Sequence, residues 1–129
     1  MKLNLAPNDA GNTVTAYGPG YVAVNGVRHE TSIVVLPERL IVPWPCAAFT
    51  DLDEAAFAHL AGLGVEILLL GTGRTHRFPH PSITRPLLDR RIGLEVMTTD
   101  AACRTYGFLV SEGRNVAAAL IVESGPATS

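Results

Sequence analysis

Hydrophobic and polar positions change their period about a third of the way along the chain. Before that point, turn-forming residues separate four short β-branched or aromatic runs, at residues 14–17, 21–24, 32–36 and 40–44. Such runs are typical of antiparallel strands joined by hairpins. Asn25-Gly26 predicts a type I′ turn, because both residues tolerate a positive φ.

After Pro45 the apolar positions recur at helical spacing. Leu52, Ala56, Phe57, Leu60 and Ala61 share one helical face. The pairs Thr50 with Asp53 and Asp51 with Glu54 both offer an N-cap for this helix, and glycines follow it. A second helix is expected at 86–91 and a third at 98–112. A continuous apolar run predicts a strand at 65–70, and further strands are expected at 93–97 and 115–122.

This order of elements predicts a mixed α/β fold in a single domain. Alternating strands and helices in the second half imply crossover units, whereas the first half contributes antiparallel strands. We expect a globular domain at 13–123, a flexible leader at 1–12 and a flexible tail at 124–129.

Composition narrows the classes of function. The chain has 129 residues and a net charge of −2, so no overall field draws it to nucleic acid or an anionic membrane. It has two cysteines without a CxxC spacing and no apolar run long enough to span a membrane. We expect a cytoplasmic protein, without cofactor or metal, that does not bind membranes; the oligomeric state stays open.

The strand at 65–70 runs directly into Gly71, Thr72, Gly73 and Arg74. Successive backbone N–H groups at the carboxyl end of a buried strand can form a cradle for a small anion. The loop lacks the third glycine of a dinucleotide fingerprint and the lysine of a P-loop. A tight turn with a purely structural role is the alternative.

The stretch from residue 74 to 91 is locally basic. It carries five arginines against one acid, Asp89, and these arginines are Arg74, Arg77, Arg85, Arg90 and Arg91. Such a segment suits an acidic protein partner, because guanidinium groups bind carboxylates with a planar fork of donors. A solvated loop and helix face is the simpler reading. Nucleic acid is the third and least favoured candidate for a partner of this segment.

Single residues elsewhere carry weaker signals. Cys103 lies one turn into the third predicted helix, where it is either a reactive thiol or a small buried residue. Arg104 either bridges to a nearby glutamate or clamps an anion beside the glycine turn. Tyr106 should bury its ring while its hydroxyl finds a partner. His76 and His80 have a metal-ligand spacing only on a helix, which the adjacent prolines disfavour.

Three blocks of sequence carry a resemblance to a known family. They are residues 66–73, residues 93–106 with the run Ala101-Ala102-Cys103-Arg104-Thr105-Tyr106, and residues 112–120. They resemble a small family of unknown biochemical function that includes mitochondrial respiratory complex I assembly factors and an adipogenesis-associated protein, and the chain is similar to the short bacterial form. The resemblance implies a three-layer β/β/α domain without established catalytic residues.

Two hypotheses for function follow. The first is a non-enzymatic interaction or assembly-accessory domain that holds an acidic partner with Arg74, Arg77, Arg85, Arg90 and Arg91. The second is a small-molecule or anion-binding domain, or an enzyme, with a pocket formed by Gly71, Thr72, Gly73 and Arg74 together with Arg104 and Tyr106.

Overall fold

A five-stranded mixed sheet forms the centre of the molecule. The computed structural model describes residues 11–123. The strands run in the order β5-β4-β8-β6-β7, where the bounds are β4 (Ile33–Leu36), β5 (Arg39–Ile41), β6 (Ile67–Gly71), β7 (Gly93–Met97) and β8 (Val116–Leu120). β8 pairs parallel to β6 and antiparallel to β4, so it joins the two halves of the chain.

Both faces of this sheet are buried, and the alternation of side chains explains how. In β6, Leu68 and Leu70 belong to one apolar cluster, whereas Leu69 belongs to the other. In β8, Ala117 and Ala119 face the first cluster and Ala118 the second. A strand buried on both faces needs apolar residues at every position, which is why these segments read as continuous apolar runs.

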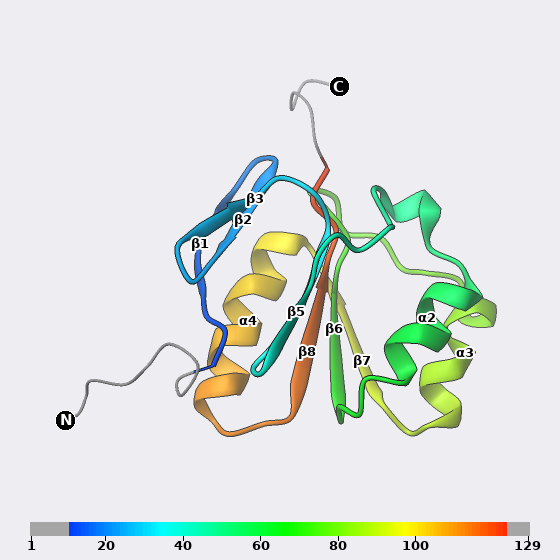
Figure 1. The fold of residues 1–129 in the computed structure, drawn as a ribbon. Helices are drawn as coiled ribbons and strands as arrows, with labels where there is room; N and C mark the ends of the chain where they lie inside the picture. The colour runs from blue at the N-terminus through cyan, green and yellow to red at the C-terminus, as the bar shows by residue number, and fades with distance from the viewer. Residues whose placement is uncertain (1–10, 124–129) are drawn as a thin grey trace.

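Three layers result (Figure 1). One side of the sheet is covered by α2 (Glu54–Ala61) and α3 (Pro81–Asp89), and the other by α4 (Thr99–Ser111) together with a small antiparallel sheet. The small sheet contains β1 (Val14–Gly18), β2 (Tyr21–Val24) and β3 (Val27–His29), and a short 3-10 helix, η1 (Phe49–Asp51), precedes α2. The predicted mixed α/β class and the three-layer β/β/α domain are confirmed.

The predicted Asn25-Gly26 turn is also confirmed. Both residues have positive φ, 52° and 83°, and Val24 pairs with Val27 across a two-residue loop. The strand that follows, β3, was not predicted, because Val27–His29 is short and exposes two of its three residues.

The predicted second helix begins too late. α3 starts at Pro81, five residues before the predicted start, because His80 caps it: its Nδ1 accepts a hydrogen bond from Ser82 N at 3.1 Å. Proline fits the first helical position, where its missing N–H is not needed. The N-cap of α2 is Asp53, whose Oδ1 accepts from Ala56 N at 2.8 Å, and not Thr50 or Asp51.

Smaller shifts occur at strand ends. The strand predicted at 65–70 spans Ile67–Gly71, the one predicted at 40–44 spans Arg39–Ile41, and the one predicted at 115–122 spans Val116–Leu120. The predicted leader and tail fall mainly outside the described residues. Asn12, at the end of the predicted leader, is held in place: its Nδ2 donates to Leu36 O at 2.8 Å and to Arg39 O at 2.9 Å.

Candidate functional site

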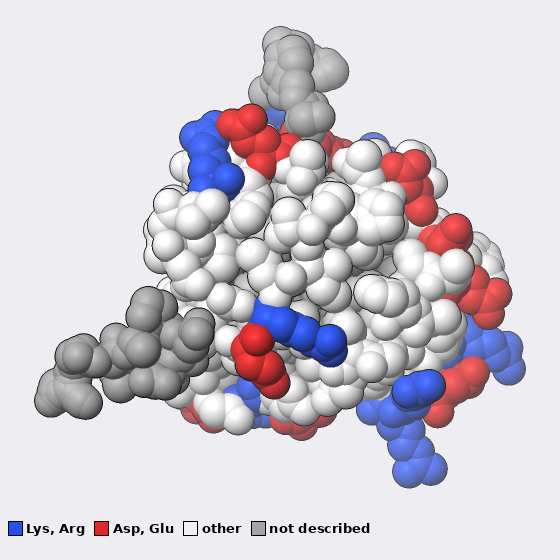
Figure 2. Space-filling model, in the orientation of Figure 1, with Lys and Arg blue, Asp and Glu red and all other residues white. Residues whose placement is uncertain are grey.

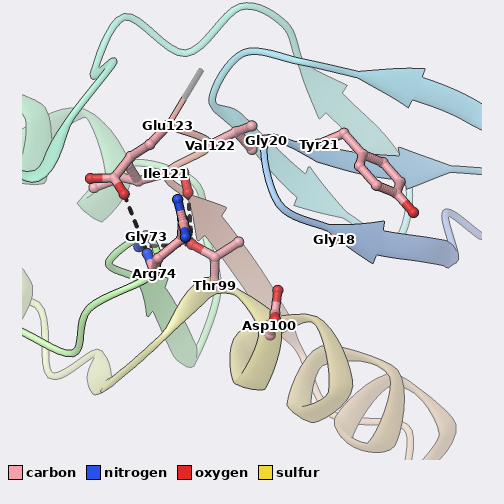
Figure 3. A pocket seen from close by; sticks show the side chains of 10 residues that line it. All are labelled: Gly18, Gly20, Tyr21, Gly73, Arg74, Thr99, Asp100, Ile121, Val122 and Glu123. Carbon is pink, nitrogen blue, oxygen red and sulfur yellow. Dashed lines mark hydrogen bonds between the residues drawn. The ribbon is translucent and has the colours of Figure 1, made fainter. Parts of the chain in front are cut away.

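The glycine turn after β6 is fastened to two other elements by its own backbone. Thr72 N donates to Met97 O at 2.8 Å, and Gly73 N donates to Thr99 Oγ1 at 2.9 Å. The same Thr99 hydroxyl donates to Ile121 O at 2.7 Å. One buried threonine at the start of α4 therefore ties the exit of β6 to the end of β8 (Figure 3).

The next N–H of this turn is taken by a carboxylate of the chain itself. Arg74 N donates to Glu123 Oε1 at 3.3 Å. A Cβ added to Gly73, whose φ is 96°, would lie 2.8 Å from the Glu123 carboxyl group. Figure 3 shows Glu123 directed at this turn, so the turn already holds an anionic group.

Two hollows of different size adjoin the turn. A hollow of about 20 Å³, lined in part by Gly73, Thr99 and Glu123, has room for about one water molecule. A neighbouring hollow of about 270 Å³ includes Arg74 and Asp100 in its lining. An external anion would have to displace the Glu123 carboxylate and approach Asp100, which is a physical argument for the structural reading of this turn.

Arg104 and Tyr106, both on α4, do not line either of these two hollows. Arg104 is exposed, and its Nη1 donates to the Tyr17 hydroxyl at 3.0 Å, so it links α4 to β1 instead of bridging to a glutamate. Tyr106 is 1% exposed, and its hydroxyl donates to Asn12 O at 3.0 Å. Burial raises the pKa of this hydroxyl, which fits a structural group.

The two cysteines are buried free thiols. Burial, followed by the charge of Asp100, raises the pKa of Cys103 to about 12, so the thiolate is disfavoured at neutral pH. This environment fits the second of the two predictions for Cys103, a small buried residue, better than a reactive thiol. Within the part of the chain that the structure describes, no group of three or more His, Cys, Asp or Glu side chains is placed to hold a metal ion.

The five predicted partner-binding arginines are all exposed. Within residues 11–123 the ion pairs are Arg28–Glu30 at 2.9 Å and Arg114–Glu66 at 3.5 Å, so none of the five is paired there. They do not form one cluster. Arg74 and Arg77 lie before α3 and Arg90 and Arg91 at its far end, separated by about 13 Å of helix. Figure 2 shows basic side chains gathered at the lower edge, beyond the ends of α2 and α3.

Two exposed apolar residues accompany these arginines. Phe78 is 74% exposed and Leu88 is 75% exposed, and both lie between Arg74 and Arg91 in the sequence. The sequence shows both residues, but their exposure depends on where α3 starts and which face it buries. The guanidinium of Arg77 lies 5.5 Å from the centre of the Phe49 ring, which holds it beside η1.

Another hollow has a largely apolar lining, and no local pattern in the sequence predicts it. It measures about 430 Å³ and lies between β5, the segment around Trp44 and the start of α2. Trp44 is 3% exposed and belongs to the core, and it also borders this hollow. No helix within the described range has the length and apolar character needed to cross a bilayer.

A family model covers most of the domain. The family described as "Protein of unknown function (DUF498/DUF598)" matches residues 14–121. Among curated proteins, the chain is 36% identical over 115 residues to the bovine NADH dehydrogenase [ubiquinone] 1 alpha subcomplex assembly factor 3. That match takes in 87% of the chain but only 61% of the length of the bovine protein. An uncharacterised protein of Rhodobacter capsulatus is 34% identical, with 94% of the chain and 96% of the relative covered.

Solved structures agree with the fold. A crystal structure of a Bordetella parapertussis protein has a TM-score of 0.83 at 44% identity and covers 88% of this chain and 98% of that one. A solution structure of a Bordetella pertussis protein described as an Mth938-like domain has a TM-score of 0.81 at 36% identity, and the match covers 98% of this chain and 96% of that one. The chain therefore belongs to the DUF498/DUF598 family and has the fold of its Mth938-like bacterial members.

Proposed function

We propose that this domain is a non-enzymatic interaction module that holds an acidic protein partner during assembly of a larger complex. The observation that carries the proposal is the exposure of Arg74, Arg77 and Arg85 together with Phe78 in one segment of the chain, and we call these four residues the arginine surface. These arginines are exposed, and none is paired with a carboxylate in residues 11–123. Phe78 is among the most exposed large apolar residues of the domain.

Physical chemistry favours a protein as the ligand of this surface. Exposed aromatic and arginine side chains are enriched at protein interfaces, where the aromatic ring supplies buried area and the guanidinium groups supply bonds to carboxylates. An isolated small anion would leave Phe78 exposed to solvent. An acidic protein surface with an apolar recess would cover the ring and neutralise the arginines together.

The relatives suggest the kind of complex. Several are named assembly factors of an NADH dehydrogenase subcomplex, and this chain spans 61% of the bovine factor. We infer by analogy that the partner belongs to a respiratory NADH dehydrogenase or to its assembly intermediates. The cytoplasmic location predicted from the sequence remains a prediction.

Charge reversal tests this proposal. The variant Arg74→Glu, Arg77→Glu, Arg85→Glu is compared with Arg28→Glu, Arg39→Glu, Arg114→Glu, which changes the net charge equally at exposed sites elsewhere. Tagged proteins are purified from the native host, and co-purifying subunits are quantified by mass spectrometry. We expect the first variant, but not the second, to lose acidic partners, with both still folded.

Two outcomes would count against the proposal. If both variants keep the same partners as wild type, the arginine surface does not bind them. If both lose them equally, net charge and not this surface is responsible. Phe78→Ser provides a test that leaves the charge unchanged, and it should weaken the same partners because it removes the apolar anchor.

A further inference from the structure

The hollow beside Trp44 differs in character from the arginine surface. It measures about 430 Å³, within the range of about 300–1,000 Å³ typical of small-molecule sites. Ile41, Trp44 and Ala56 contribute to its apolar lining. The groups in its lining that can carry a charge include Asp51, Asp53 and His59, and no arginine or lysine lines it.

The two carboxylates keep capacity for a ligand. Asp51 Oδ2 accepts from Ala48 N at 3.1 Å, and Asp53 Oδ1 accepts from Ala56 N at 2.8 Å. Neither carboxylate is in an ion pair with any residue between 11 and 123. Figure 2 shows acidic side chains along the edge of the molecule over η1 and α2. One oxygen of each group is thus left for a cation.

The field of these carboxylates reaches the interior of the hollow. Cys46 also lines it, and the pKa of its thiol is raised by burial first and then by the charges of Asp51 and Asp53. A negative potential that disfavours a thiolate favours a cation at the same place. Arg77, which lies over the Phe49 ring, does not line the hollow.

Trp44 forms an apolar wall of the hollow. It is 3% exposed and belongs to the apolar cluster between the central sheet and α2. Trp44 borders two described hollows, this one and a second of about 230 Å³ on the side of Pro43 and Ser32.

We propose that the hollow beside Trp44 binds a small organic cation, a free primary amine with a short aliphatic or aromatic body. The ammonium group would lie between Asp51 and Asp53, and the apolar body would pack against Ile41, Trp44 and Ala56. This site shares no residue with the arginine surface. If the amine site is wrong, the proposed binding of an acidic partner is unaffected. If that partner binding is wrong, the amine site is likewise unaffected.

The single tryptophan of the chain makes the test direct. Hexylammonium, hexanol and hexanoate are titrated into ¹⁵N-labelled protein, and Trp44 is followed by its fluorescence and by its indole N–H resonance. We expect saturable changes at Trp44 and at the amides of α2 with hexylammonium, weaker changes with hexanol, and the weakest with hexanoate.

Matched variants separate charge from shape. Asp51→Asn with Asp53→Asn removes both charges while asparagine can still cap α2, and it should weaken hexylammonium binding about tenfold. Asp89→Asn with Glu112→Gln removes two exposed charges elsewhere and should leave binding unchanged. Ala55→Leu narrows the hollow from an exposed helical position and should weaken hexanol and hexylammonium alike.

Three results would overturn the proposal. These are no saturable change at Trp44 with hexylammonium, hexanoate binding as tightly as hexylammonium, and equal hexylammonium binding by the Asp51→Asn, Asp53→Asn variant. A capped Ala-Lys-Ala tripeptide presents the same ammonium on a protein side chain. Tighter binding of this peptide would identify a protein segment as the occupant and reject the free amine.

Discussion

Removing the Thr99 hydroxyl should lower the stability of the domain, because this one group makes two buried hydrogen bonds. Thr99 is 7% exposed, and its Oγ1 accepts from Gly73 N at 2.9 Å while donating to Ile121 O at 2.7 Å. Thr99→Val preserves the shape of the side chain and removes both hydrogen bonds. It leaves a buried backbone N–H and a buried carbonyl each without this partner.

The magnitude follows from the desolvation of those two groups. An unsatisfied buried polar group costs about 1–3 kcal/mol, so two of them should lower the free energy of unfolding by about 3 kcal/mol. Helix propensity differs little between threonine and valine and contributes a few tenths of this at most. The loss is a large share of the roughly 5–15 kcal/mol that stabilises a typical domain.

Urea denaturation followed by circular dichroism measures this loss. With a slope of about 1.5 kcal/mol per molar urea, the midpoint should fall by about 2 M. Thr99→Ser is the control, because it keeps the hydroxyl and loses one methyl group worth about 1 kcal/mol. Hydrogen exchange at the Gly73 amide should accelerate in Thr99→Val only. If Thr99→Val is as stable as Thr99→Ser, the hydroxyl does not fasten the turn and the reasoning fails.

Two further predictions concern the same region. Gly71→Ala should lower the free energy of unfolding by about 2 kcal/mol, because its Cβ would lie 2.8 Å from the Thr99 Cα. Gly107→Ala should instead be neutral or stabilising, because a Cβ there would meet no atom within 4 Å beyond its chain neighbours and its own helix backbone. Urea titration distinguishes the two variants. Burial raises the pKa of Cys103 from 9.0 to about 12, so its contribution to stability is complete below pH 9 and is lost as the pH rises toward 12. Over that window wild type should lose stability faster than Cys103→Ala, by about 1.4 kcal/mol per pH unit, and equal slopes in pH-dependent urea titrations would contradict this.

Much of the fold could be predicted because its central strands are buried on both faces. A strand such as β6 or β8 must be apolar at every position, and this leaves a continuous signal in the sequence. The start of α3 could not be predicted in the same way. It depends on the His80 ring accepting from Ser82 N, and prolines on either side of His80 suggested an irregular segment.

The site was harder to predict than the fold, because surfaces depend on which elements meet. Arg104 is two residues from Tyr106 in the sequence, but it contacts Tyr17 on β1 while Tyr106 contacts Asn12. The hollow beside Trp44 combines residues from β5, η1 and α2, so no local sequence pattern predicts it. Exposure of Phe78 likewise follows from tertiary packing and not from its neighbours in sequence.

The glycine turn shows why a motif needs an account of every donor before it is assigned to a ligand. Thr72, Gly73 and Arg74 present consecutive N–H groups, as an anion cradle does, but each already has an acceptor within the chain. Their acceptors lie on β7, α4 and the segment after β8, so the turn joins three elements at the carboxyl end of the sheet. Glycine is needed there for close approach: a Cβ on Gly71 would meet the α4 backbone, and a Cβ on Gly73 would meet Glu123. Because the backbone of this turn is committed to packing, we propose recognition instead by side chains that form no ion pair within residues 11–123, those of the arginine surface and of the hollow beside Trp44.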